Sequence, residues 1–92
     1  MAQVVVTLKI MPDGPESDLS PIQDKAKEEI RKFAGKAEIK VEIEPIAFGL
    51  KALKIFFTMD ESKGSTDELE DKIREIPEVS SVEAVDVRRA VG

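Results

Sequence analysis

The chain has 92 residues, of which 41% are apolar and 36% charged, and a formal net charge of −5; this is typical of one small globular domain with a highly charged surface. The absence of Cys and His excludes disulfides, zinc sites with thiolate or imidazole ligands, and imidazole acid–base catalysis. The acidic charge argues against general binding to nucleic acid or anionic membranes, and no apolar run suits a membrane span or signal peptide, so we expect a cytoplasmic protein.

The first part of the chain predicts a strand followed by a helix. Apolar residues alternate with others from Val4 to Met11, which is typical of a strand. Ser20 is the expected N-cap of the helix, with Pro21 in the first turn and Gln23 completing a capping box. Gly35 is the expected helix end. The apolar stripe of this helix consists of Ile22, Ala26, Ile30 and Phe33.

The middle of the chain predicts two strands that follow one another. Residues 39 to 43 alternate between apolar and charged side chains, as in a half-exposed strand, and Pro45 ends this pattern. The second strand runs from Leu53 to Met59 with the same period of two. Its expected core face carries Leu53, Ile55, Phe57 and Met59.

The last third predicts a helix and a final strand. A capping box of Ser65 and Glu68 marks a helix that begins at Ser65 or Thr66, and Pro77 marks its end. Its apolar stripe consists of Leu69, Ile73 and Ile76. The final strand covers residues 79 to 87, and its alternation slips near Val85, between that residue and Val82, which indicates a β-bulge.

The resulting order is strand–helix–strand–strand–helix–strand. Two split strand–helix–strand units of this kind predict a ferredoxin-like α/β (α+β) sandwich, with a four-stranded antiparallel sheet and both helices on one face. Right-handed crossovers place the first and third strands in the centre of the sheet. We expect residues 1–92 to form this single domain.

An enzyme is the first functional alternative. Carboxylates cluster at the second helix and could serve acid–base chemistry or bind Mg²⁺, although a solvated helix start that complements the helix dipole explains them as well. They are Asp67, Glu68, Glu70 and Asp71. The sequence has no Gly-rich phosphate-binding loop. We therefore expect no covalent catalysis and no cofactor or metal.

Binding of RNA or of a small regulatory ligand is the second alternative, because such modules share the predicted strand order. RNA-recognition domains stack bases on aromatic residues of the two central strands. Only Phe56 on the third strand offers such a ring, whereas the first strand presents Val5, Thr7 and Lys9. The sequence motifs of RNA-recognition domains are absent. A ligand-binding module stays open, with only the weak loop candidate 11–14 in its favour.

The segment between the middle strands is unusually apolar for a connection. Loops normally run over the surface and are polar, but Ile46 to Leu50 contains apolar residues, a glycine and Phe48. Phe48 either contacts a protein partner, supported by a tight turn at Gly49, or fills the end of the core. The pattern leaves both alternatives open.

Three segments of the chain resemble the archaeal elongation factor 1-beta family, the guanine-nucleotide exchange factors for the GTPase that delivers aminoacyl-tRNA. They are Val4–Pro12, Glu44–Leu53 and Val79–Arg89. The resemblance implies a ferredoxin-like fold, and exchange of GDP for GTP on elongation factor 1-alpha through protein contacts near its switch regions and Mg²⁺ site. It also implies a domain without direct nucleic-acid or membrane contacts, which we expect to be a monomer when free.

The resemblance also implies where the GTPase is contacted. Eukaryotic relatives grip the GTPase with two ends of the sheet, and the contact aromatic of their loop falls on Phe48 here. A lysine near their carboxyl end disturbs the Mg²⁺ and phosphate site, but this chain has Arg88 and Arg89 followed by Ala90-Val91-Gly92. Two alternatives follow: Arg88 or Arg89 substitutes for the lysine as a fixed cation, or exchange depends more on switch-region contacts. Their additional N-terminal domains are missing, which implies a minimal catalytic domain. The predicted contact residues are Ile46, Ala47, Phe48, Gly49, Leu50, Lys51, Arg88 and Arg89.

Overall fold

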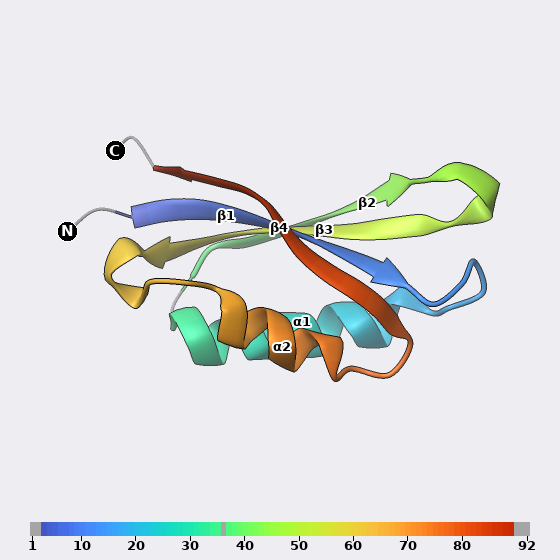
Figure 1. The fold of residues 1–92 in the computed structure, drawn as a ribbon, viewed down its shortest axis with the longest axis horizontal. Coiled ribbons are helices and arrows are strands. Elements are labelled where there is room, and N and C mark those ends of the chain that lie inside the picture. Colours follow the sequence, from blue (N-terminus) through green and yellow to red (C-terminus); the bar gives the residue numbers. More distant parts are fainter. Residues whose placement is uncertain (1–2, 36, 90–92) are drawn as a thin grey trace.

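The computed structural model describes residues 3–35 and 37–89 of the chain. Figure 1 shows a sheet with both helices lying on one of its faces. The elements in chain order are β1 (Gln3–Pro12), α1 (Leu19–Ala34), β2 (Ile39–Pro45), the short 3-10 turn η1 (Ala47–Gly49), β3 (Lys51–Asp60), a second short turn η2 (Glu61–Lys63), α2 (Asp67–Arg74) and β4 (Val79–Arg89). This order confirms the predicted ferredoxin-like fold.

The sheet has the strand order β2-β3-β1-β4, and all neighbouring strands are antiparallel. The predicted central position of the first and third strands is therefore confirmed. The Cα atoms extend over 42 Å along the longest axis and 22 and 18 Å along the others, so the domain is a long, thin slab whose sheet runs along the slab (Figure 1). Neither α1 nor α2 is long and apolar enough to cross a membrane.

The core lies between the sheet and the two helices. Each strand and helix contributes apolar side chains to it, and Leu8, Ile30, Leu53, Ile55 and Ile73 are completely buried. Burying a side chain of this size stabilises a fold by roughly 1.5–3 kcal/mol before the entropy of ordering is counted. The two helices leave the other face of the sheet uncovered (Figure 1).

The last strand contains the predicted bulge. Leu8 of β1 pairs with Ala84 and Thr7 pairs with Asp86, which leaves Val85 without a partner across the ladder. A second shift near the start of β4 leaves Ser80 out in the same way. The strand continues beyond the predicted end at Val87, because Arg88 and Arg89 still pair with Val5 and Val4 of β1. Arg88 and Arg89 therefore belong to the strand and do not follow it.

The start of α1 differs from the prediction. Asp18, and not Ser20, is the N-cap: its Oδ1 accepts a hydrogen bond of 3.0 Å from the backbone N–H of Ser20. Asp and Ser cap about equally well, so cap preference alone does not distinguish these two residues, and the Pro21 and Gln23 pattern favoured Ser20. The helix begins at Leu19, which packs against the core and fixes the earlier start. The predicted end is confirmed, because Gly35 has a left-handed φ of 72°.

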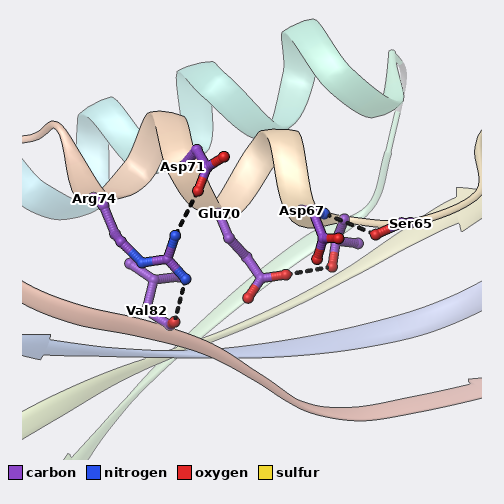
Figure 2. Close-up of polar contacts among 7 residues, drawn as sticks. Ser65, Asp67, Glu70, Asp71, Arg74 and Val82 are labelled. Carbon is purple, nitrogen blue, oxygen red and sulfur yellow. Dashed lines mark hydrogen bonds and ion pairs between the residues drawn. The ribbon is translucent and has the colours of Figure 1, made fainter.

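The start of α2 also differs from the predicted capping box. Ser65 accepts from the backbone N–H of Asp67 at 3.1 Å, and Thr66 donates to the carboxylate of Glu70 at 2.8 Å (Figure 2). Farther along the helix, the guanidinium of Arg74 pairs with Asp71 and reaches the backbone oxygen of Val82 on β4. This chain of polar contacts ties α2 to the neighbouring edge strand.

Candidate partner-binding site

The segment between β2 and β3 forms a closed hairpin tip. The backbone N–H of Ile46 donates to the oxygen of Leu50 at 2.7 Å, and the N–H of Leu50 donates to the oxygen of Ala47 at 3.2 Å. Both flanking residues are half-buried, whereas the three residues of η1 between them are exposed. Lys51 follows as the exposed first residue of β3, opposite Pro45. The six predicted contact residues of this segment therefore form one short tip.

Phe48 projects from the tip into solvent. Its side chain is 95% exposed, which decides between the two alternatives in favour of an exposed aromatic and against a core plug. Its backbone is left-handed, with φ 62° and ψ 31°. A residue with a side chain in this conformation costs about 1–2 kcal/mol. An exposed aromatic held in strained backbone is a reason to infer a function for it.

The tip lies close to the loop between β1 and α1. Gly49 has a φ of 77°, and a Cβ atom at this position would lie 3.7 Å from the Cβ of Pro15. Below the tip, the same loop and the hairpin enclose a hollow of about 240 Å³ that we call the hairpin cleft. Its walls include Pro12, Gly14, Pro15, Leu19, Ile43 and Lys51.

Arg88 and Arg89 are both exposed and both ion-paired. Nε of Arg88 lies 2.7 Å from Oδ2 of Asp86, and Nη2 of Arg89 lies 3.3 Å from Oε2 of Glu61 in η2. Next to this pair, the backbone N–H of Ser62 donates to Asp60 and lowers the pKa of that carboxyl below its ordinary value. The arginines therefore sit in a region of balanced, solvent-exposed charges.

The hairpin tip and the two arginines lie at opposite ends of the sheet. Lys51 pairs with Pro45 at the tip, whereas Val4 pairs with both Met59 and Arg89 at the other end. The eight steps from Lys51 to Met59 span roughly 26 Å, because a strand rises about 3.3 Å a residue. Figure 1 shows the β2–β3 hairpin and the end of β4 on opposite sides of the molecule. The structure thus does not bring Phe48 and the arginines together.

Exposed apolar residues lie on the β2–β3 hairpin and on the second half of β4. Across residues 3–35 and 37–89, four large apolar side chains are exposed: Ile43, Phe48, Val85 and Val87. Ile43 and Phe48 belong to the hairpin, Val87 directly precedes the arginines of β4, and Val85 lies at the bulge opposite the middle of β1. Sequence reasoning assigned no site role to the three aliphatic residues, because alternation alone assigns them to a strand face and does not tell where the helices stop covering that face.

Two of the other sequence candidates, Glu70 and Asp71, have side-chain partners within the domain. Of the carboxylates at α2, Glu70 accepts from Thr66 and Asp71 pairs with Arg74 (Figure 2). No three acidic side chains in the described part of the chain are grouped closely enough to hold a metal ion. Phe56 is half-buried on the uncovered sheet face, where it lines a shallow hollow with Val5.

Comparison with proteins of known structure supports the fold. The de novo designed protein Foldit4 superposes with a TM-score of 0.65 at 20% identity, covering 98% of each chain. BlrP1 BLUF superposes with a TM-score of 0.54 at 9% identity, covering all of this chain and 57% of the other. At such identities the similarity concerns the fold alone.

Comparison of sequences shows the family. The model of the EF-1 guanine nucleotide exchange domain matches residues 5–90. The protein named elongation factor 1-beta in Methanobrevibacter smithii is 42% identical over 90 residues, covering 97% of this chain and 98% of that protein. Its namesake in Metallosphaera sedula is 42% identical over 91 residues, covering 97% of each chain. The chain therefore belongs to the EF-1 guanine nucleotide exchange domain family, as its three signature segments predicted.

Proposed function

We propose that this protein is a guanine-nucleotide exchange factor for elongation factor 1-alpha, the GTPase that delivers aminoacyl-tRNA. Membership of the exchange-domain family supports this proposal, as do relatives named elongation factor 1-beta. The observation that carries it is the 95% exposed, left-handed Phe48, because aromatic side chains anchor protein interfaces. Residues 1–92 act as a single exchange domain in this proposal.

Exchange of this kind needs no covalent chemistry by the factor. A factor that binds the nucleotide-free GTPase more tightly than the nucleotide-bound form must weaken nucleotide binding by the same ratio, because the two equilibria are linked. GDP then leaves faster, and the more abundant GTP refills the empty site. The factor contributes a rigid surface that fits the nucleotide-free GTPase, and the compact tip at Phe48 suits this role.

In this mechanism, the two ends of the sheet contact different parts of the GTPase. The hairpin tip docks on the GTPase through Phe48. Arg88 and Arg89, which lie at the other end of the sheet, roughly 26 Å away along the strands, approach the Mg²⁺ and phosphate site of the GTPase. Exposed ion pairs contribute only about 0–1 kcal/mol, so the arginines can leave Asp86 and Glu61 for phosphate oxygens. A guanidinium binds such oxygens with two parallel hydrogen bonds.

The direct test is release of a fluorescent GDP analogue from the GTPase after excess GTP is added. We expect the protein to accelerate release at substoichiometric amounts. Phe48→Ala should lower the second-order rate constant of release about tenfold or more while the free energy of unfolding stays within about 0.5 kcal/mol, because the ring is exposed. Unfolding of this variant would show that Phe48 is structural.

The arginines are tested in the same assay. Replacing Arg88 and Arg89 together with Ala should slow release from the bound complex and leave the domain folded, because both ion pairs are exposed. Full activity of this double variant would remove the arginines from the mechanism. If the unaltered protein fails to accelerate release from a competent GTPase, the proposed function is wrong and a ligand-binding module becomes the better interpretation.

A further inference from the structure

The outer edge of β2 is regular, whereas the opposite edge of the sheet is interrupted. The strand order places β2 and β4 at the two edges. β4 contains two register shifts, and bulges of this kind protect an edge from pairing with another chain. β2 pairs with β3 from Ile39 to Pro45 without any shift. Its outer side therefore presents a regular row of backbone groups to which a further strand can be added.

A backbone hydrogen bond next to β2 shows which of its residues face outward. The N–H of Thr58 donates to the oxygen of Glu38 at 3.3 Å, directly before the strand begins. This pair continues the β2–β3 register, and in an antiparallel ladder only every second pair exchanges hydrogen bonds. The even-numbered residues of β2 therefore bond to β3. The N–H and C=O groups of the odd-numbered residues point away from the sheet, and these residues are Ile39, Val41 and Ile43.

The outward row is closed at both of its ends. At one end, the next outward position is Pro45, which has no N–H. At the other end it is Ala37, whose N–H already donates to the oxygen of Gly35 at 2.9 Å. An added strand can therefore exchange both backbone hydrogen bonds only with the residues between these ends, which are centred on Val41.

A second copy of β2 fits this row in one antiparallel register. When Val41 lies opposite its own copy, Ile39 lies opposite Ile43 of the second copy, and the outward backbone groups of both strands meet. The same register places Lys40 opposite Glu42 of the second copy, on the sheet face that the helices leave uncovered. Both charged side chains are exposed, and their Nζ and Oε2 atoms already lie 3.5 Å apart within one chain. The edge is therefore complementary to itself in its backbone, apolar and charged groups.

Other registers lack this fit. A slip by two residues keeps the outward backbone groups opposite each other, but it places Lys40 opposite its own copy in one direction and Glu42 opposite its own copy in the other. Like charges directly opposite each other are unfavourable in a ladder. A slip by one residue sets outward backbone groups against inward ones and turns the apolar side chains to the wrong face. The charges that shield this edge from unrelated strands therefore select a second copy of it.

One like-charged opposition lies at the ends of the self-paired register. Glu44 comes opposite Glu38 of the second copy. Within its own chain, Oε2 of Glu44 lies 3.7 Å from Nζ of Lys54. This ion pair compensates the charge of Glu44, so the opposition at the ends is weaker than one between two unpaired carboxylates.

We propose that β2 pairs with β2 of a second copy of this chain in the register centred on Val41. The two sheets then join into one, with the helices of both copies on the same face. Ile43, which is 52% exposed, is partly covered by Ile39 of the second copy. Because the contact involves one short strand of each copy, the association is weak, and a dilute sample stays monomeric. This inference does not depend on the proposed exchange function.

The first test is sedimentation of the full chain from about 10 μM to about 1 mM, the range that a weak contact requires. We expect the unaltered protein to pass from monomer to dimer as its concentration rises. Lys40→Glu sets carboxylates against carboxylates across the new pair, and Glu42→Lys sets ammonium groups against ammonium groups, so each variant alone should stay monomeric. An equimolar mixture of the two should dimerise again, because unlike charges then meet between the different chains. Lys25→Glu, the same charge change at an exposed position of α1, is the matched control and should dimerise like the unaltered protein.

The second test is cross-linking, which reports the register because the chain has no cysteine of its own. Residues opposite each other in a pair without hydrogen bonds have Cα atoms about 4.5 Å apart, a separation that a disulfide can bridge. A mixture of the Lys40→Cys and Glu42→Cys variants should therefore form disulfide-linked dimers under mild oxidation, and faster than either variant alone. Both positions are exposed, so the variants should fold.

Three results would overturn the self-pairing of β2. The first is an unaltered protein that stays monomeric over the whole concentration range. The second is a dimer that neither charge reversal weakens, since the copies then associate through another surface. The third is cross-linking that is no faster in the mixture than in the separate cysteine variants, which excludes the proposed register. GDP release measured on dilute, monomeric protein tests the exchange function separately, so either proposal can fail while the other stands.

Discussion

Phe48 is stabilised neither by its surroundings nor by its backbone conformation. The side chain is 95% exposed, so it gains almost no burial energy. The left-handed backbone costs about 1–2 kcal/mol relative to an ordinary conformation, and glycine avoids this cost because it has no Cβ. Both observations therefore support the proposed role of Phe48 as a contact with the GTPase.

This conflict predicts that Phe48→Gly stabilises the fold and abolishes efficient exchange. Glycine removes the left-handed strain, but it also has a larger conformational entropy in the unfolded chain, which opposes folding. The free energy of unfolding should therefore rise by about 0.5–1 kcal/mol. Urea denaturation should show a higher midpoint at an unchanged slope. The GDP-release assay should show the same loss as for Phe48→Ala. A less stable variant would mean that the ring supports the tip.

Glu78 supplies the matched control for this prediction. It is the other described residue with a side chain and a positive φ, at 71°, and it lies between α2 and β4. Its backbone oxygen accepts from the N–H of Asp13 at 2.8 Å, a bond that glycine retains. Glu78→Gly should therefore raise the stability by a similar amount and leave GDP release unchanged. Loss of exchange here would show that relief of strain alone disturbs the protein.

The start of α1 gives a prediction that discriminates between two neighbouring residues. Asp18 caps the helix in the structure, whereas the sequence pattern favoured Ser20. Asp18→Ala should lower the free energy of unfolding by about 1 kcal/mol. Ser20→Ala should change it by less than about 0.5 kcal/mol, because Ser20 is exposed and contributes only its backbone N–H. Thermal or urea unfolding distinguishes the two, and a larger effect of Ser20→Ala would reinstate the original prediction.

At the scale of the elements, the tie between α2 and β4 can be removed without altering the apolar core. Arg74 reaches the backbone oxygen of Val82 and pairs with Asp71 (Figure 2). Arg74→Met keeps the aliphatic stem but removes these contacts, and it should lower the free energy of unfolding by about 0.5–1 kcal/mol. Arg31→Met in the exposed last turn of α1 is the control, with a change below about 0.5 kcal/mol. Equal losses would show a general effect of lost charge.

The elements themselves were predictable because their periods are strong. Alternation placed the four strands, and the stripes at Ile22 to Phe33 and Leu69 to Ile76 placed both helices. The bulge at Val85 was also visible as a slip in the alternation, because the extra residue must interrupt a period of two. The tip was predictable only as an unusual apolar connection. Its left-handed Phe48 follows from closing the hairpin in three residues, which sequence pattern does not specify.

The exposure of Ile43 shows the limit of prediction from one strand. Its alternation is as regular as that of Val41, yet Val41 packs against the core and Ile43 faces the hairpin cleft. The difference depends on where α1 begins and on how the loop around Pro15 approaches Gly49. Both are tertiary relations between segments distant in sequence, so no local pattern contains them.

At the scale of the whole molecule, the long sheet separates the two proposed contact regions. Lys51 beside the tip and Arg89 at the other end are held apart by β3 and β1, the two central strands. A continuous, hydrogen-bonded sheet is stiff along its strands, so the two ends keep a fixed separation when they meet the GTPase. In the proposed mechanism, the domain is therefore a rigid spacer between a docking contact at Phe48 and a cationic contact at the arginines.

This separation predicts that damage at the two ends is additive. Sites farther apart than about 7–10 Å, with no shared partners, change free energies independently to within about 0.5 kcal/mol. We expect the loss of activation free energy for GDP release in the triple variant Phe48→Ala, Arg88→Ala, Arg89→Ala to equal the sum of the losses from Phe48→Ala and from the arginine pair. The measurement is the second-order rate constant of release for the three variants and the unaltered protein at subsaturating concentration.

The two ways in which additivity can fail have different meanings. A loss in the triple variant that is much smaller than the sum would mean that both ends are required for acceleration. Damage at one end then already removes most of the acceleration, and damage at the second end adds little. A loss much larger than the sum would mean that each end compensates for the other, as expected if the GTPase can rotate about one remaining contact. Because Phe48 and the arginines share no contact within the sheet, either form of coupling would have to pass through the GTPase, whereas additivity identifies the domain as a rigid spacer with two independent ends.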